Sequence, residues 1–321
     1  MAGDLSTQIQ GGNQMRAWVM LAGVLAMAAA LLVAAPLGSA QRGDDGCGDA
    51  RRGGDRGGSD DRRGDRVAQL DVIGLTADAR LICFETDEPE DARTIGALTG
   101  LMGDTRLVGI DYRPNGGALY GVGNAGSVYT INDDTAAATK VGQLSVALAG
   151  ASFGVDVNPA ADALRIISDT GQNLRFSFAA GTTTVDGTLT YPPATMPATG
   201  VTGAGYTNND SDPNTATTLY DVDSTLDQVA IQSPANSGQL AATGKLGVDT
   251  NSIIGFDIYS TIRNGTTVDL DAFASLTVGG QSGFYAITLF TVRQVARELL
   301  FEESGDRDRD SAESALISAD V

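Results

Sequence analysis

The sequence predicts an all-β protein that folds as a β-propeller of five four-stranded blades. The first observation is a recurring Gly-x-Asp motif, each copy of which opens a run of short strands; the copies begin at Gly109, Gly154 and Gly255. The second is spacing, because these starts lie 45 and 101 residues apart, which suits one and two blades of roughly 40 to 50 residues each. The third is the lack of helical periods of about 10 to 15 residues, which argues against βαβ units.

The fullest copy of the repeat contains four predicted strands of alternating apolar and polar residues, at 107–112, 118–122, 127–131 and 138–142. These strands are rich in Val, Ile, Tyr and Thr, which favour pleated structure. Their connections carry turn-forming residues at 114–117, 124–126 and 132–134. This unit is therefore expected to form one antiparallel blade.

Three further copies follow the same order. They cover 153–185, 201–223 and 254–287, and the middle one is diverged, with a polar insertion at 208–214. The first globular segment matches only the last three strands of a blade, at 72–75, 80–84 and 93–96. One strand is therefore missing at the N-terminal side of that blade.

A strand from the C-terminal end can complete the first blade and remove the exposed sheet edges. The sequence therefore predicts five blades closed by a strand exchange. Residues 299–301 could supply the closing strand, whereas a helix at 292–300 would leave the ring incompletely closed. A six-bladed ring is the other alternative, but it needs a repeat that the sequence does not contain.

The N-terminal region predicts export. Residues 18–35 are uncharged and apolar, Arg16 precedes them, and small residues follow up to Ala40, so residues 1–40 are expected to be a signal peptide, with Met15 as an alternative start. The expected location is secreted or extracytoplasmic, in the cell envelope. The alternative is an uncleaved N-terminal membrane anchor, since the apolar run approaches the ~20 residues that span a bilayer.

Two segments beside the propeller domain, which is expected at 67–301, are predicted to be disordered. Residues 41–66 are rich in Gly, Asp and Arg and nearly lack apolar residues, so burial cannot offset their chain entropy, and they are expected to be a spacer. Residues 302–321 hold seven acidic residues against two arginines and are expected to be an acidic tail.

The net charge of −19 argues against a nucleic-acid partner, because phosphates are bound by surfaces of the opposite sign. Such acidity is in keeping with solubility, salt tolerance or attraction of cations. The expected partner is an unidentified protein or a carbohydrate. The mature chain is expected to be a monomer without a membrane span.

Cys47 and Cys83 are the two cysteines of the chain. Export permits a disulfide between them, which would pin the spacer to the first blade. Cys83 alternates with Ile82 and Phe84 in a predicted strand, so a buried free thiol is the equal alternative.

The chain contains no histidine, which excludes Ser-His-Asp and Cys-His nucleophile arrangements and imidazole-based zinc sites. Carboxylates remain, and the motif supplies three candidate ligand-binding residues that are expected to converge on the central channel, Asp111, Asp156 and Asp257. Their first expected role is structural, as acceptors of backbone hydrogen bonds. They could also hold calcium or serve as the paired acids of a glycosidase. No cofactor is predicted beyond calcium as a candidate.

A polar segment at 168–175 is the second candidate for ligand binding. It lies between two predicted strands and could present a carboxylate, two amides and a guanidinium together, from Asp169, Gln172, Asn173 and Arg175. A hairpin connection explains the same residues without a ligand.

Five blocks of the sequence together resemble a known family. They lie at 72–76, 107–114, 153–159, 168–175 and 206–209. Their order and spacing are similar to those of the bacterial domain of unknown function 4394, over about residues 70–287. The resemblance implies a secreted, propeller-like domain with no established activity, and it supplies no catalytic residues. The chain departs from the family after Ile287, where a closing apolar strand is expected.

These observations predict an exported, non-enzymatic β-propeller that acts as a binding or interaction module at the cell surface or in the medium. The alternative is a carboxylate-dependent, carbohydrate-active enzyme that uses the channel aspartates. The glutamates of the core occupy loop-like positions, such as Glu85, Glu88 and Glu90. That placement weakens the enzyme alternative, because a catalytic acid of raised pKa usually sits in a cleft beside its partner.

Overall fold

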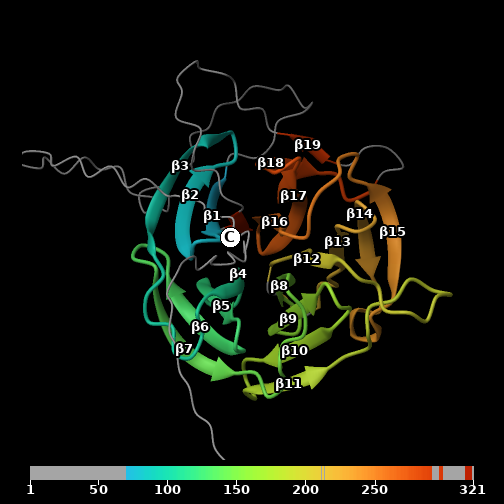
Figure 1. Cartoon of the computed structure of the whole chain (residues 1–321), viewed down its shortest axis with the longest axis horizontal. Coiled ribbons are helices and arrows are strands. Elements are labelled where there is room, and N and C mark those ends of the chain that lie inside the picture. The colour runs from blue at the N-terminus through green and yellow to red at the C-terminus, as the bar shows by residue number, and fades with distance from the viewer. Residues whose placement is uncertain (1–69, 211, 213, 291–295, 299–314, 320–321) are drawn as a thin grey trace, which may run out of the picture. The chain divides into compact units, whose positions relative to one another are not determined.

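The computed structural model describes residues 70–210, 212, 214–290, 296–298 and 315–319. Within these residues the chain forms five antiparallel sheets of four strands each. The sheets surround a common axis as the blades of a β-propeller (Figure 1). The predicted fold class is thereby confirmed.

From the axis outward, the strands of a blade follow one another in chain order, except in the first blade, which has β20 innermost. The first blade consists of β20 (Ala315–Ala319), β1 (Asp71–Thr76), β2 (Arg80–Glu85) and β3 (Glu88–Ala97). The second consists of β4 (Leu107–Arg113), β5 (Ala118–Gly123), β6 (Ser127–Asn132) and β7 (Ala137–Gln143). The third consists of β8 (Phe153–Asn158), β9 (Ala163–Ser168), β10 (Asn173–Ser177) and β11 (Thr182–Val185).

The two remaining blades follow the same order. The fourth consists of β12 (Val201–Tyr206), β13 (Leu219–Asp223), β14 (Gln228–Gln232) and β15 (Leu240–Lys245), with a short 3-10 helix, η2 (Ala235–Ser237), between its last two strands. The fifth consists of β16 (Gly255–Arg263), β17 (Thr266–Val278), β18 (Gln281–Ile287) and β19 (Ala296–Glu298).

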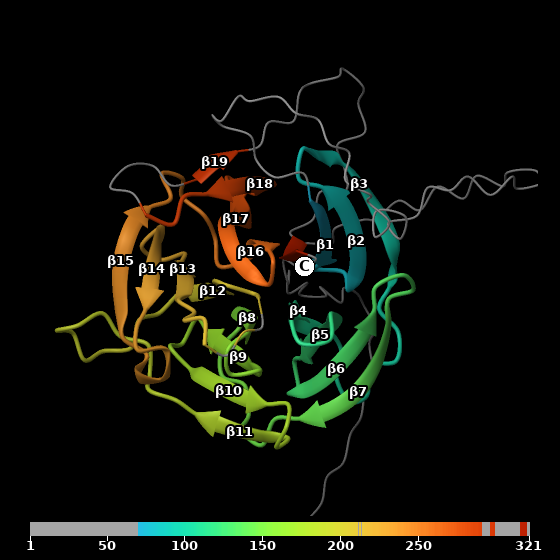
Figure 2. The same ribbon diagram turned by 180° about the vertical axis from the view of Figure 1, so that it is seen from behind.

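The innermost strand of the first blade comes from the C-terminal end of the chain, as the strand exchange predicts. β20 pairs antiparallel with β1, so that Ala315 lies opposite Thr76 and Ala319 opposite Val72. The inner strands contact one another in the order β20, β4, β8, β12 and β16, and β16 contacts β20 in turn (Figure 2). This closed ring rules out the six-bladed and incompletely closed alternatives.

The position of the closing strand differs from the one considered from the sequence. Residues 299–301 lie outside the described residues, and the closing strand lies at Ala315–Ala319, inside the segment expected to be a disordered tail. This five-residue run carries no charge, and averaging the composition over 302–321 hides it. Ala296–Glu298 forms a strand that pairs with β18, where a helix was the alternative.

Apolar clusters fill the spaces between neighbouring blades. Ile110 on β4 belongs to the same buried cluster as Leu75 and Leu81 of the first blade. Val108, two residues earlier on β4, belongs to a cluster with Val155 of the third blade. The pairing of β4 with β5 shifts register between Leu107 and Gly109, which interrupts the usual alternation of sides, so Val108 and Ile110 join clusters on different sides of the blade. Each blade therefore needs both neighbours to bury its apolar surface.

The glycines of the repeated motif lie where neighbouring inner strands touch. A Cβ atom at Gly109 would lie 2.4 Å from Cγ2 of Val155 on β8, and one at Gly154 would lie 2.9 Å from the carbonyl carbon of Gly203 on β12. Both distances are shorter than real Cβ contacts, so a side chain would push the blades apart. The glycine of the motif is therefore explained by close packing around the axis.

Some expectations concern parts of the chain beyond these blades. The signal peptide at 1–40 and the spacer at 41–66 lie outside the described residues. Among the residues that are described, no helix is long and apolar enough to cross a membrane. Cys83 is buried on β2 and is disulfide-bonded; Cys47, the only other cysteine of the chain, lies outside the described residues.

Candidate functional site

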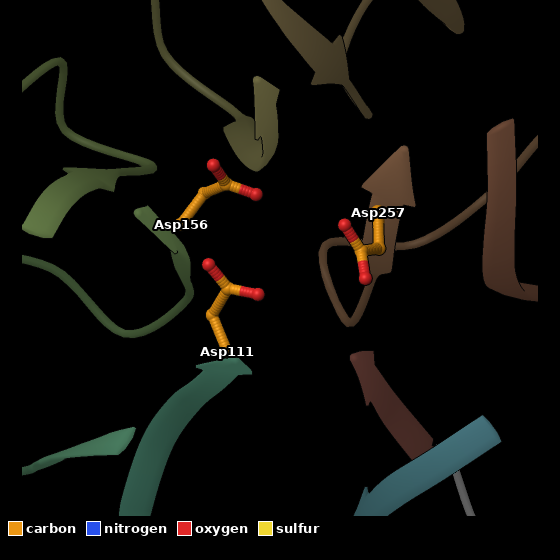
Figure 3. A group of neighbouring side chains, drawn as sticks. All are labelled: Asp111, Asp156 and Asp257. Atoms are coloured by element: carbon orange, nitrogen blue, oxygen red, sulfur yellow. The ribbon is translucent and has the colours of Figure 1, made fainter. Parts of the chain in front are cut away.

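The three aspartates of the motif meet near the axis of the ring. Asp111 lies on β4, Asp156 on β8 and Asp257 on β16, and their carboxylates point toward one another (Figure 3). One carboxylate oxygen from each lies within 4.8 Å of those of the other two. All three residues are buried, with between 4% and 7% of their surface exposed. We call this group the acidic cluster.

Two of these carboxylates also link one blade to the next. Asp111 Oδ2 accepts a hydrogen bond from the backbone N–H of Val157 at 2.6 Å, and Asp156 Oδ1 accepts one from the N–H of Tyr206 at 3.1 Å. Val157 and Tyr206 each follow the corresponding motif position of the neighbouring blade. The structural role expected for these two aspartates is therefore present.

The fourth blade breaks this series. Gly205 stands where the second, third and fifth blades have the aspartate of the motif, so the fourth blade has no carboxylate to reach the next inner strand. In the fifth blade, Asp257 Oδ1 accepts a hydrogen bond from the N–H of Ile258, its own neighbour, at 2.6 Å. The divergence of the fourth blade therefore removes one carboxylate from the axis. The N–H of Ile258 in the fifth blade then bonds to Asp257 of its own strand and not to a carboxylate of the preceding blade.

Burial and like charge act together on the acidic cluster. The pKa of Asp156 is raised well above its usual value, first because burial disfavours the charged form and then because Asp111 and Asp257 are negative neighbours. Three ionised carboxylates at this spacing repel one another strongly in a protein interior. The cluster is therefore suited to hold either protons or a cation.

The spacing of the acidic cluster fits a calcium ion. Calcium takes oxygen ligands at about 2.3 to 2.6 Å, so two oxygens that share one ion lie at most about 5 Å apart. The oxygens of Asp111, Asp156 and Asp257 meet this limit. These three residues are the ones that would hold the ion, and calcium at this place remains a prediction.

A pocket opens at the end of the ring where most of the inner strands begin. Its volume is about 380 Å³. Its walls come from the end of β1 and the turn after it, from the starts of β4 and β8 with the residues before them, and from the three residues before β16. The lining side chains that bear on binding are Leu75, Arg106, Ser152, Phe153, Ser252 and Ile253. We call this the mouth pocket.

The mouth pocket and the acidic cluster are separated along the axis. Beyond the pocket a small cavity of about 10 Å³ lies among the inner strands, lined by Gly109, Gly154 and Gly255 among others. This is about the space that one water molecule needs. Each aspartate of the cluster comes two residues after one of these glycines. The two features are therefore distinct sites on one axis.

The polar segment at 168–175 is held by internal contacts. Asp169 accepts hydrogen bonds from the N–H of Ala151, and the Gln172 side chain binds the N–H of Ala149 and the carbonyl of Ala147. These two residues fix the connection between β7 and β8. Two of the four residues predicted to share a ligand surface, Asp169 and Gln172, therefore bond to this loop.

The other two members of that segment point to a different place. Asn173 is 1% exposed and donates to the carbonyls of Gly187 and Ala235. Arg175 forms an ion pair with Asp186 at 3.2 Å. The structure therefore divides the four predicted residues between two networks, and it brings together the three motif aspartates instead.

Residues 80–299 match the family described as Domain of unknown function (DUF4394). The chain belongs to this family. No curated protein matches this DUF4394 chain.

Solved structures similar to the DUF4394 chain include an auxiliary nutrient binding protein from Bacteroides ovatus ATCC 8483, with a TM-score of 0.37 and 9% identity over 67% of this chain and 55% of that one. The major allergen Mala s 1 of Malassezia sympodialis has a TM-score of 0.37 and 10% identity over 71% and 70%. The GH74 enzyme of Niastella koreensis has a TM-score of 0.35 and 12% identity over 73% and 38%. The chain spans just over half the length of the first of these proteins.

A buried arginine in the third blade of this DUF4394 domain was not predicted from the sequence. Arg165 on β9 is 1% exposed and donates to Asp186 Oδ2 at 2.6 Å, to Asn173 Oδ1 at 2.7 Å and to Asn236 Oδ1 at 2.8 Å. A signal was present, because Arg165 lies within a strand whose other residues are almost all apolar. A charge in a strand buried on both faces needs a partner.

A buried acid in the fourth blade of the DUF4394 domain was also missed. Asp221 on β13 is fully buried, and neither carboxylate oxygen has a hydrogen-bond partner among the described residues. Burial raises the pKa of Asp221 well above its usual value, Arg165 opposes that rise, and Asp223 adds to it. Asp221 lies opposite Ala204, at the register that Ile166 takes opposite Val155 in the third blade. It therefore occupies a position suited to an apolar side chain.

Proposed function

We propose that this domain is an exported binding module without enzymatic activity, and that its ligand binds in the mouth pocket. The observation that carries the proposal is the pocket itself. Its volume of about 380 Å³ falls within the roughly 300 to 1,000 Å³ typical of small-molecule sites. Its wall combines apolar side chains such as Phe153 and Ile253 with the hydroxyls of Ser152 and Ser252, as binding sites commonly do.

The support beneath the mouth pocket favours binding to a preformed surface. Phe153 and Ile254 belong to the starts of inner strands or lie directly before them, and both are buried. The side chains of Ser152 and Ser252, from two different blade connections, share a hydrogen bond of 3.0 Å. A site that is already ordered loses little conformational entropy when a ligand binds.

The carbohydrate-active alternative has less support. The paired acids of glycosidases flank the bond that they cleave and must reach the substrate, whereas all three residues of the acidic cluster are buried, with between 4% and 7% of their surface exposed. A sugar that entered through the mouth pocket would meet the cavity of about 10 Å³ before it reached Asp111. The acids are therefore poorly placed to act on a substrate bound in the pocket.

Export belongs to the proposal as well. It rests on the apolar run at 18–35 and the small residues up to Ala40, and the spacer at 41–66 would tether the ring at a distance from its attachment. Fractionation of cells that express the full chain, followed by N-terminal sequencing of the exported protein, tests this part. A start near residue 41 is expected, and retention of the whole chain in the cytoplasm would contradict it.

The binding proposal is tested with N-phenyl-1-naphthylamine, an uncharged probe that fluoresces when it enters an apolar site. Protein purified from cells that express the full chain is expected to bind one molecule per chain. Ala77 is exposed and lines the pocket, so Ala77→Trp should fill the pocket and abolish this binding. Ala179→Trp, on the exposed turn after β10, is the matched control and should bind the probe as the wild type does.

Two outcomes would overturn the proposed function. Equal probe binding by the Ala77→Trp and wild-type proteins would show that the mouth pocket is not the site. Release of reducing ends from a polysaccharide by the wild-type protein, lost in Asp156→Asn, would establish the enzyme alternative instead. Thermal unfolding of every variant separates a local effect from loss of the fold.

A further inference from the structure

We infer that the mouth pocket takes a small molecule with an apolar body and one anionic group, and that Arg106 anchors the anionic group. This inference rests on the proposed function, because it names the ligand class of the same pocket. It is carried by three features of the lining: one charge of positive sign, one hydroxyl pair and a continuous apolar wall.

Arg106 is the only charged residue among those that line the mouth pocket. Four other arginines of the described blades are engaged by aspartates: Arg80, Arg113, Arg165 and Arg175. Arg106 has no such carboxylate among the residues that the structure describes, and its guanidinium is placed only by a bond of 3.4 Å to the carbonyl of Ala151. In a chain of net charge −19, an unpaired guanidinium at a pocket makes the local charge opposite to the overall one.

The two serines add a hydrogen-bond donor beside the apolar wall. Ser152 Oγ donates to Ser252 Oγ at 3.0 Å. Each hydroxyl carries one proton, and the bond between them uses one of the two. The pair therefore keeps one O–H that can donate to an oxygen of a ligand. A guanidinium and a hydroxyl are both donors, and such a set suits a carboxylate, sulfonate or phosphate group.

Apart from Thr76, whose hydroxyl is bonded to Asp78, the remainder of the lining is apolar. Leu75, Val108, Phe153 and Ile254 are buried around the pocket, while Ile253 keeps 41% of its surface exposed. The part of Ile253 that is exposed would be covered by a bound apolar group, at a gain of roughly 25 cal/mol per Å² of apolar surface. The wall therefore favours a ligand whose body is hydrocarbon or aromatic.

The same lining disfavours other ligand classes. It contains no Asp, Glu, Asn or Gln side chain, so it offers a cation no counter-charge and a sugar few of the acceptors that its hydroxyls need. The carbohydrate partner expected from the sequence is therefore not the ligand that this pocket suits. An anion with an apolar body satisfies the guanidinium, the hydroxyl and the wall at once.

The test compares two probes that differ by one charge. 8-Anilinonaphthalene-1-sulfonate has nearly the same aromatic body as N-phenyl-1-naphthylamine and adds one sulfonate. The wild-type protein is expected to bind the sulfonate the more tightly. Arg106→Gln should weaken binding of the sulfonate about tenfold, which corresponds to about 1.4 kcal/mol, and should leave the uncharged probe unchanged. Arg263→Gln, at the far end of β16, controls for the loss of one positive charge.

The outcomes separate this inference from the proposed function. If Ala77→Trp abolishes binding of both probes but Arg106→Gln and Arg263→Gln weaken the sulfonate equally, the pocket binds ligands and the anchoring role of Arg106 is wrong. If Ala77→Trp has no effect on either probe, the proposed site itself is wrong. A selective loss of sulfonate binding in Arg106→Gln, with unchanged thermal unfolding, is the result that the inference requires.

Discussion

The carboxylate of Asp111 on β4 accepts a hydrogen bond of 2.6 Å from the backbone N–H of Val157 on β8. A single side chain thus takes part both in the acidic cluster and in the contact between the second and third blades. The hydrogen bond and the negative charge of this residue make separate contributions to stability, and two substitutions distinguish them.

Asp111→Asn and Asp111→Ala both remove the charge, but only the alanine variant removes the acceptor of the Val157 N–H. Because a buried donor left without a partner costs about 1 to 3 kcal/mol, we expect the alanine variant to be less stable than the asparagine variant by that amount. Urea unfolding measures the difference. Equal stabilities would mean that the link between the blades contributes nothing.

Calcium is expected to raise the thermal midpoint of the wild-type protein relative to the protein in chelator. The reason is that the three carboxylates of the acidic cluster lie within 4.8 Å of one another and a cation would bind only the folded state; a ligand at 100 times its Kd adds about 2.7 kcal/mol. In the combined variant Asp111→Asn, Asp156→Asn, Asp257→Asn the response should vanish. If calcium leaves the thermal midpoint of the wild-type protein unchanged, protons and not a cation neutralise the acidic cluster.

Asp221 is expected to make the folded state less stable as the pH rises. Burial raises the pKa of Asp221 in the folded protein above its ordinary value of 3.8, so the folded state retains a proton that the unfolded state releases. The resulting stability is fully present below about pH 4 and is lost as the pH rises toward the folded pKa, at about 1.4 kcal/mol for each pH unit between the unfolded and folded pKa values. Asp221→Asn should make this decline shallower in urea unfolding between pH 4 and pH 8; the part that remains comes from Asp156, whose pKa is also raised.

Asp223→Asn is the matched control for that experiment. Asp223 lies two residues further along β13, and its Oδ1 accepts hydrogen bonds from the N–H groups of Thr225 and Leu226. Because Asp223 is the smallest of the influences on the pKa of Asp221, the Asp223 variant should keep most of the decline of stability with pH. If Asp221→Asn also keeps it, the buried Asp221 carboxyl is not its source.

Truncation after residue 314 is expected to destabilise the whole ring. It removes β20, which pairs with β1 along Val72–Thr76, and leaves β1 as an unpaired inner edge that favours association between chains. Truncation after residue 319 keeps β20 and is the control. Size-exclusion chromatography and thermal unfolding of the two proteins should differ; indistinguishable behaviour would contradict the role of β20 as the closing strand.

The repeated motif allowed the blades and the meeting of three acids to be predicted, because Gly109, Gly154 and Gly255 open equivalent inner strands and equivalent strands face one axis. The mouth pocket could not be predicted in the same way. Its walls come from 75–77, Ala79, 106–108, 151–153 and 252–254, and only the closed ring brings these segments together. The sequence alone therefore did not indicate that Arg106 lies at a pocket.

The polar segment at 168–175 shows what composition alone cannot predict. Its composition suggested a shared surface, but composition does not say which way side chains turn. Asp169 and Gln172 turn toward a neighbouring loop, while Asn173 turns toward Arg165. Asn173 also donates to the carbonyl of Ala235 in the fourth blade, and a contact of this kind depends on the packing of two blades.

The pairing of β20 with β1 also determines when the ring can close during synthesis of the chain. The first blade gains its inner strand from residues that leave the ribosome after every other strand of the ring, so a nascent chain can build four complete blades and still lack a closed ring. Closure requires the two ends of the domain to meet across the largest sequence separation that the chain offers, and such contacts form slowly.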